Sequence, residues 1–232
     1  MNNYDVNTYG ISLDKQVSQV MKRVYVKMFL ALLVTAATAW IIGTNETFIL
    51  YMAQHSWLYW GLMLAELGMV IGISGAINKM KSGLASSLFY LFAVVNGAVF
   101  SIILAVYSID SIFKTFLITA GVFGAMSVYG YFTEKDLTKF GSFLRMALWG
   151  LIICIVVNIF MKSNTMDWII SFVGVVIFIG LTAWDTQKIK QMAMQMPDAT
   201  DGRLATLGAL SLYLDFINLF LYLLRFFGAS RD

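Results

Sequence analysis

Seven apolar stretches, each about the length of a membrane-spanning helix, dominate this chain of 232 residues. A helix needs roughly 20 apolar residues to cross the ~30 Å hydrocarbon core of a bilayer. Inside that core every backbone polar group must be paired within the protein. The stretches are 24–43, 58–77, 84–107, 112–132, 143–161, 168–186 and 205–227. The sequence therefore predicts an all-α, polytopic membrane helix bundle with seven transmembrane helices.

The composition leaves little room for a separate soluble domain. Hydrophobic residues make up 59% of the chain and charged residues 12%, against about 25% charged residues in a soluble domain. We expect a cytoplasmic N-terminal arm over 1–23, one seven-helix domain over 24–228 and a C-terminal tail over 229–232. The apolar segment 47–53 is too short to span and is expected at the membrane interface.

The basic residues predict the orientation. Twelve of the 16 Lys and Arg residues fall in the N-terminal region and in the second, fourth and sixth loops. Because cytoplasmic loops are enriched in Lys and Arg, the N-terminus is expected to be cytoplasmic. Residues 1–20 are too polar for a cleavable signal peptide. The first membrane helix is therefore expected to serve as the insertion signal.

Several function classes are disfavoured by what the chain lacks. The basic residues form no block suited to nucleic acid. Cys154 and His55 are the only residues of their kinds, so no internal disulfide, zinc spacing or serine–histidine arrangement exists. Intramembrane aspartyl proteolysis needs a Gly-x-Gly-Asp segment, which surrounds neither Asp185 nor Asp215. We therefore expect no enzyme activity and no cofactor.

Asp215 is the most costly residue of the last apolar stretch. A charge at the centre of a membrane helix costs about 2.5–3.5 kcal/mol on insertion scales, so such residues are usually functional. Asp215 lies on one helical face in a polar stripe. Its members are Ser211, Asp215, Asn218, Tyr222 and Arg225. Such a stripe is expected to face the bundle interior or a water-filled path.

Three other ionisable residues in or at the ends of the predicted spans are candidate functional residues: Glu66, Asp185 and Lys79. At about 1.5 Å per residue, Glu66 and Asp215 lie at similar central depth, and Asp185 lies near Lys79 at the inner level. This estimate separates Asp185 from Asp215 by about 10 Å along the membrane normal. Structural readings stay open: Glu66 as a hydrogen-bonded core carboxyl, and Asp185 as a residue at the water surface.

Close carboxyl groups in an apolar site cannot both ionise easily, so they share a proton. Such a pair is a pH sensor, and when ionised it repels or recruits a hard cation such as Ca²⁺. Lys79 could neutralise a carboxylate and hold a closed state.

Small and amide residues predict how the helices pack. We expect Asn96 and Asn158 to form hydrogen bonds between helices, and small residues to allow close helix contact. These small residues are Gly68, Gly72, Gly75, Ala76, Gly121, Gly124 and Ala125.

Four segments resemble the transmembrane Bax inhibitor motif family, over nearly the whole chain. The most specific is Ala209–Phe220, reading ALSLYLDFINLF, followed by Leu224–Gly228. The others are Phe132–Thr138 (FTEKDLT), Thr182–Ile189 (TAWDTQKI), and Ile77–Met80 with Val95–Gly97.

The resemblance implies a seven-helix bundle in which the C-terminal helix is central, and a pH-sensitive Ca²⁺ leak. By the same resemblance Asp185 and Asp215 form a hydrogen-bonded pH sensor and, with Glu66, the Ca²⁺ site. Lys79 stands where the family has an arginine latch. Lysine keeps the charge but lacks the two-pronged geometry of arginine.

We therefore predict a pH-sensitive calcium leak channel, in the bilayer of a bacterial inner membrane, gated by the Asp185–Asp215 pair. The alternative is a regulatory or scaffold protein that binds a membrane protease or stress-response protein and conducts no ions. Ca²⁺ flux through the purified protein separates the two.

Overall fold

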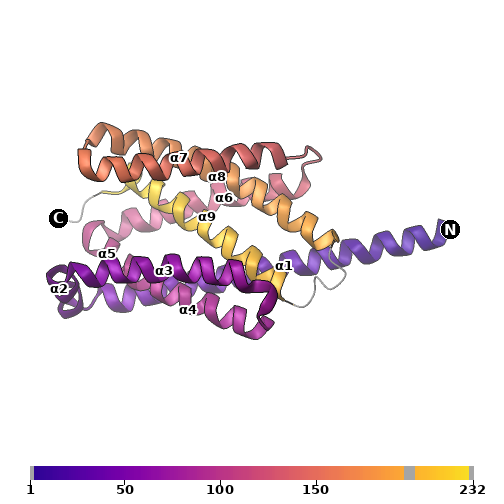
Figure 1. Ribbon diagram of the computed structural model, residues 1–232, viewed down its shortest axis with the longest axis horizontal. Helices are drawn as coiled ribbons and strands as arrows, with labels where there is room; N and C mark the ends of the chain where they lie inside the picture. Colours follow the sequence, from indigo (N-terminus) through magenta and orange to yellow (C-terminus); the bar gives the residue numbers. More distant parts are fainter. Residues whose placement is uncertain (1–2, 196–201, 230–232) are drawn as a thin grey trace. The chain divides into compact units, whose positions relative to one another are not determined.

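The computed structural model describes residues 3–195 and 202–229, and these are helical apart from short connections (Figure 1). Pro197 and the end of the predicted C-terminal tail lie outside this part of the chain. The helices are α1 (Asn3–Gly43), α2 (Glu46–Gln54), α3 (Ser56–Ala76), the 3-10 turn η1 (Ile77–Lys79), α4 (Ser82–Phe100), α5 (Ile103–Val106), α6 (Ile109–Phe132), α7 (Thr138–Met161), α8 (Asn164–Gln195) and α9 (Arg203–Phe227).

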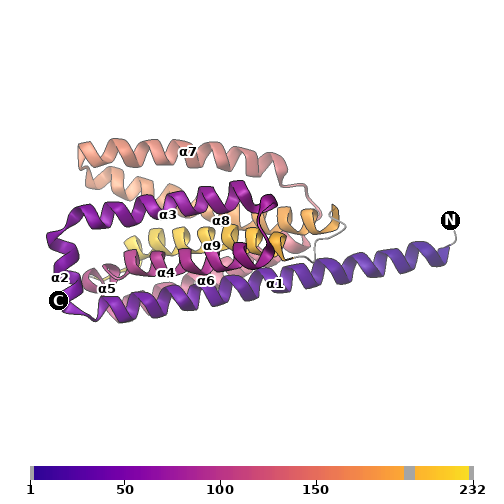
Figure 2. The same ribbon diagram turned by 60° about the horizontal axis from the view of Figure 1, so that its bottom comes forward.

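Within the described residues, seven helical segments are long and apolar enough to cross a membrane, which confirms the predicted fold class. All seven are longer than predicted, and two of them by more than ten residues. The first begins at Leu13 and the sixth runs from Asn164 to Gln195. Figure 2 shows α1 as one continuous helix. The polar residues before position 24 contain no proline, so nothing in their sequence breaks the helix.

The described residues form two compact units. The first contains the chain up to Val106 together with the described part of Ile189–Leu210. The second contains Tyr107–Lys188 and the chain from Ser211 onward. Both α8 and α9 therefore contribute residues to each unit.

In the first unit α1 packs against α4, and α3 packs against α4 as well. The buried face of α1 follows a spacing of three or four residues, which is the helical repeat. It comprises Val17, Val20, Val24, Met28, Ala31 and Thr35. Thr35 Oγ1 donates to the carbonyl of Ala93 at 3.0 Å. Gly97 allows this approach, because a Cβ there would lie 2.6 Å from the Thr35 carbonyl oxygen.

In the second unit, glycines let α6 and α7 approach α8. A Cβ on Gly130 would collide with the carbonyl of Ala183, and one on Gly141 with the Trp184 ring. The antiparallel pair α7 and α8 is visible in Figure 1. These contacts place two helices, α6 and α7, against the segment of α8 that carries Asp185.

The predicted roles of other glycines are wrong. A Cβ on Gly68, Gly72, Gly75, Gly121 or Gly124 would meet no described atom within 4 Å. Small residues at helical spacing mark a flat face, but the spacing does not say whether another helix covers it.

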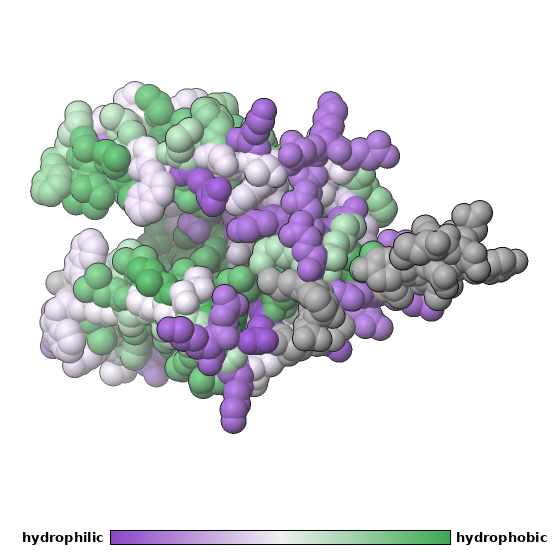
Figure 3. Space-filling model, turned by 45° about the vertical axis from the view of Figure 1, so that its right-hand side comes forward, coloured by the Kyte–Doolittle hydropathy of each residue, from purple (hydrophilic) through white to green (hydrophobic). Residues whose placement is uncertain are grey.

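The surface is largely apolar, as lipid requires. Figure 3 shows hydrophobic side chains over much of the visible face. Trp149 is 69% exposed and Phe160 82% exposed. The C-terminal helix α9, in contrast, is mostly buried. In its most apolar segment 67% of the residues are buried, the largest share among the seven candidate membrane helices. This burial agrees with the expected central position of α9.

Candidate functional site

Asp185 of α8 and Asp215 of α9 lie side by side in the second unit and form a side-chain hydrogen bond. Asp215 is 4% exposed. Two carboxylates only accept, so this hydrogen bond requires a proton on one of the two groups. The Oδ2 atom of Asp215 is buried without a hydrogen-bond partner among the described residues. The pair can therefore hold one proton between its two carboxyl groups.

This contact overturns the estimate that separated the two aspartates by about 10 Å in depth. That estimate placed Asp185 at the inner end of its helix, near position 186. The helix instead continues to Gln195, so Asp185 has ten further helical residues beyond it. Helix ends read from apolar length were the source of the error, since a helix can extend past the lipid core.

Two cations lie near the pair. Lys188 and Arg145 both interact electrostatically with Asp185, and Lys188 interacts with Asp215. Both cations also contact the neighbouring Trp184 ring, with Arg145 Cζ 4.8 Å and Lys188 Nζ 4.9 Å from its centroid. The aspartate pair is therefore largely buried and has two cations nearby.

The residues that follow Asp185 hold the connection between α6 and α7. The Gln187 side chain accepts from the Leu137 N–H at 2.8 Å and donates to the Lys135 carbonyl at 2.8 Å. Thr186 Oγ1 donates to Ser127 Oγ at 3.5 Å. These bonds fix the helical turn that presents Asp185. The segments FTEKDLT and TAWDTQKI are therefore neighbours in space.

Glu66 lies in the first unit, where Asn96 Nδ2 of α4 donates to its Oε1 at 2.8 Å. The predicted hydrogen bond from Asn96 between helices is confirmed. Glu66 belongs to the first unit and the aspartate pair to the second, so they form two separate carboxyl sites. Lys79 is exposed at the end of η1 and has no ion pair within the described parts of the chain.

The polar stripe of α9 faces α8. Besides the Asp215–Asp185 bond, the Tyr222 ring stacks on Phe178 with centroids 5.9 Å apart, over the space left by Gly174. Asn218 Nδ2 donates to its own helix, at the Leu214 carbonyl. Ser211 is half-buried. The stripe was predicted to face either the bundle interior or a water-filled path, and these contacts match the bundle interior.

Two polar clusters were not singled out from the sequence. Lys27 donates to Ser86 Oγ at 2.5 Å and to Thr206 Oγ1 at 2.7 Å. The sequence had marked Lys27 only as a topology signal, and its hydroxyl partners are far away in the chain.

The second cluster joins α7, α8 and α9. Asn158 Nδ2 donates to Asp167 Oδ1 at 2.8 Å, and Arg225 NH1 lies 3.5 Å from the same oxygen. The predicted hydrogen bond from Asn158 between helices is thereby confirmed. Asp167 itself was missed, although an acidic residue beside an apolar stretch was a visible signal.

Metal-ligand residues do not cluster in the described chain. No group of three or more His, Cys, Asp or Glu side chains there could hold a metal ion.

Similar proteins extend over almost the whole chain. An uncharacterised protein of Borreliella burgdorferi is 45% identical over 217 residues, covering 93% of this chain and 94% of that protein. The inner membrane protein YbhL of Escherichia coli K12 is 44% identical over 214 residues, covering 91% and 92%. Protein RP147 of Rickettsia prowazekii is 41% identical, covering 95% and 94%. The sequence model described as "Inhibitor of apoptosis-promoting Bax1" matches residues 17–232. Together with its seven apolar helices, these matches show that the chain is a multi-pass membrane protein of the Bax inhibitor family.

Proposed function

We propose that this protein is a pH-sensitive calcium leak channel gated by the proton shared between Asp185 and Asp215. The observation that carries the proposal is their hydrogen bond in a buried site, which exists only while a proton is present. Ca²⁺ is the proposed transported ion, because it prefers carboxylate and other oxygen ligands.

The proton decides the charge of the pair. With one proton the two carboxyls attract each other through the hydrogen bond. Without it, two negative charges lie next to each other in an apolar region, where their repulsion is much stronger than in water. The ionised pair then separates or recruits a cation. Either response changes the contact between α8 and α9.

The latch is the second part of the proposal. Lys79 is an exposed cation that has no ion pair in the described chain. The positive charge of Lys79 is attracted to an ionised carboxylate but not to a neutral, protonated carboxyl group. If Lys79 holds the closed state, adding protons releases it. Ca²⁺ flux is therefore expected to rise as the pH falls, and Glu66 is proposed to assist cation passage.

The proposed location and orientation rest on the placement of Lys and Arg residues and on the similar proteins. We propose an inner membrane location, because the relative YbhL is named an inner membrane protein, with the N-terminus in the cytoplasm. Lipid is the surrounding partner. No covalent chemistry and no cofactor belong to the proposed cycle.

Ca²⁺ flux into liposomes that contain the purified protein and an enclosed calcium dye tests the proposal. Wild type is expected to conduct, with a rate that depends on pH. Asp215→Asn retains the shape of the side chain but cannot ionise, so it should abolish the pH dependence.

A matched control is Asp110→Asn. Asp110 is an exposed residue paired with Lys114 at 2.6 Å, so its change should leave the profile intact. If Asp215→Asn kept the wild-type profile, the sensor assignment would be wrong. If the wild-type protein alone conducted no Ca²⁺, the regulatory or scaffold role would replace the channel.

A further inference from the structure

A pocket of about 320 Å³ lies in the second unit, beside the turn between α7 and α8. Its polar lining comes from Asn158, Lys162, Asn164, Asp167 and Arg225, and its apolar lining from Ile155, Ile159 and Ile170. The aspartate pair and its neighbours are not among these residues. The pocket is thus a separate site with a charged part and an apolar part.

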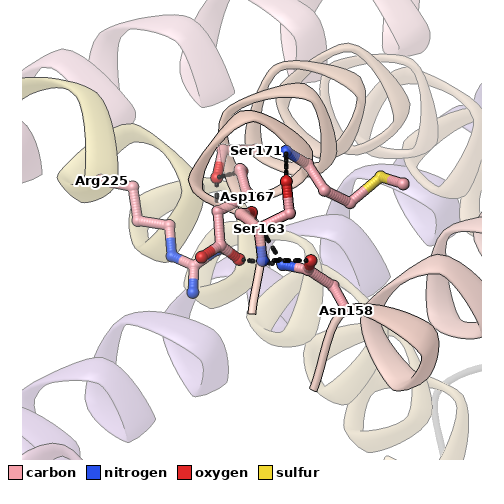
Figure 4. A network of polar contacts seen from close by, with 6 residues as sticks. Asn158, Ser163, Asp167, Ser171 and Arg225 are labelled. Atoms are coloured by element: carbon pink, nitrogen blue, oxygen red, sulfur yellow. Dashed lines mark hydrogen bonds and ion pairs between the residues drawn. The ribbon is translucent and has the colours of Figure 1, made fainter. Parts of the chain in front are cut away.

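Three of the polar lining residues, Asn158, Asp167 and Arg225, are held in place before any ligand arrives (Figure 4). Asn158 Oδ1 accepts from the Ser163 N–H at 3.1 Å, and its Nδ2 donates to Asp167 Oδ1. Arg225 NH1 reaches Ser171 Oγ at 3.4 Å and Asp167 at 3.5 Å. These bonds tie three helices together around the pocket, so binding there needs little ordering of the protein.

The charge of the lining is positive. Lys162 and Arg225 contribute two cations and Asp167 one anion. The contacts of Arg225 use only NH1, and both are long for hydrogen bonds. Lys162 is exposed and has no partner among the described residues. Both cations therefore have donors available for an anionic group.

The surroundings place the pocket at the boundary between lipid and water. It lies where α7 and α9 end and α8 begins, all three being candidate membrane helices. Trp168, 60% exposed, stacks on Phe172 with centroids 5.9 Å apart, and tryptophan is enriched at this boundary. Ile159 is 54% exposed on the apolar side of the pocket. An occupant would meet cations on one side and lipid-facing isoleucines on the other.

We propose that this pocket binds the phosphodiester headgroup of a membrane phospholipid. Lys162 and Arg225 contact the phosphate oxygens, and Asp167 positions Arg225. Ile155 and Ile159 contact the glycerol and the first carbons of the acyl chains. A freely soluble phosphate would use the cations but not the isoleucines, so the apolar wall favours the lipid. The proposal does not depend on ion conduction.

Native mass spectrometry of the full-length protein, released from micelles containing phosphatidylglycerol, tests this site. Wild type is expected to retain the lipid in preference to diacylglycerol with the same chains, which lacks the phosphodiester. Lys162→Gln should weaken retention about fivefold, the size expected for one cation beside an anionic lipid. Lys162 has no described partner, so this change should leave the thermal unfolding temperature unaltered.

Lys139→Gln is the matched control, because Lys139 is an exposed lysine in the first turn of α7, outside the pocket lining. Equal retention by the two variants would overturn the proposal. Equal retention of diacylglycerol would show that only acyl chains bind. Inorganic phosphate that bound wild type and displaced the lipid would identify a soluble anion site instead.

Discussion

At the scale of single residues, Glu66 shows how a carboxyl is accommodated inside an apolar helix. Its helix, α3, is exposed along much of its length, but Glu66 itself is half-buried and accepts a hydrogen bond from Asn96 at 2.8 Å. A buried acceptor left without its donor costs about 1–3 kcal/mol. The sequence marked both residues as polar outliers and did not pair them.

The Glu66–Asn96 bond is expected to couple the two residues energetically. A double-mutant cycle with Glu66→Ala and Asn96→Ala should give a coupling of about 1 kcal/mol, in the range found for hydrogen bonds between membrane helices. Unfolding of the purified protein in detergent measures it. A coupling of zero would mean that the bond adds no stability. Glu66→Gln, which keeps an acceptor oxygen, should lose less than Glu66→Ala.

Asp136 is the described carboxyl outside the membrane helices for which a pH effect is expected. Its Oδ1 accepts from the Thr138 N–H at 2.8 Å. Hydrogen bonds from the Thr138 side chain and backbone hold the pKa of Asp136 below its usual value. The stabilisation is complete above the unfolded-state pKa of about 3.9 and is lost as the pH falls through the lower, folded-state pKa.

Thr138→Val should therefore raise the pKa of Asp136 part of the way toward its ordinary value, since the backbone donor remains. NMR titration of labelled aspartate carboxyls follows the change. Thr133→Val is the control, because Thr133 Oγ1 accepts from the Lys135 N–H and not from the segment around Asp136. An unchanged pKa in Thr138→Val would remove the hydroxyl as a cause.

At the scale of helices, glycines decide how closely α6 and α7 approach α8. Gly130 meets the backbone of Ala183, and Gly141 meets the Trp184 ring. Backbone atoms and a buried ring cannot easily move aside. Both contacts flank Asp185, so helix spacing and the position of the aspartate pair are linked.

Gly130→Ala is expected to destabilise the protein by about 1–3 kcal/mol through overpacking. Gly121→Ala, in the same helix, adds a methyl where no described atom lies within 4 Å. It should be neutral or stabilise by up to about 1 kcal/mol, because alanine favours helix over glycine. Thermal unfolding of the two variants compares them. Similar unfolding temperatures would show that α6 can shift away from α8.

At the scale of the whole molecule, charge placement predicts a cytoplasmic N-terminus. Seven candidate membrane helices place Lys81 and Lys135 on one side and Thr44 on the other. All three residues are exposed. Cys154, the only cysteine of the chain, can be removed to give a clean background.

In a Cys154→Ser background, Thr44→Cys should react with a membrane-impermeant thiol reagent in intact cells. Lys81→Cys and Lys135→Cys should react only after the membrane is permeabilised, since cytoplasmic loops carry the basic residues. The labelled fraction in each case gives the orientation. The reverse pattern would place the N-terminus outside and contradict the charge rule for this protein.

The sequence by itself determined the helical class, the seven membrane segments and the residues that are costly to bury. Those properties depend on local composition and length, which lipid constrains strongly. Only the tertiary structure decided the pairs Glu66 with Asn96 and Arg225 with Asp167. It also brings Asp215 to Asp185, a pair that the family resemblance implied and the length estimate had separated. Pairing depends on where helices end and which faces meet, and apolar lipid-facing and protein-facing residues look alike in sequence. Because sequence does not show which helix faces meet, the glycines predicted from their spacing were not the ones that approach α8, which are Gly130 and Gly141.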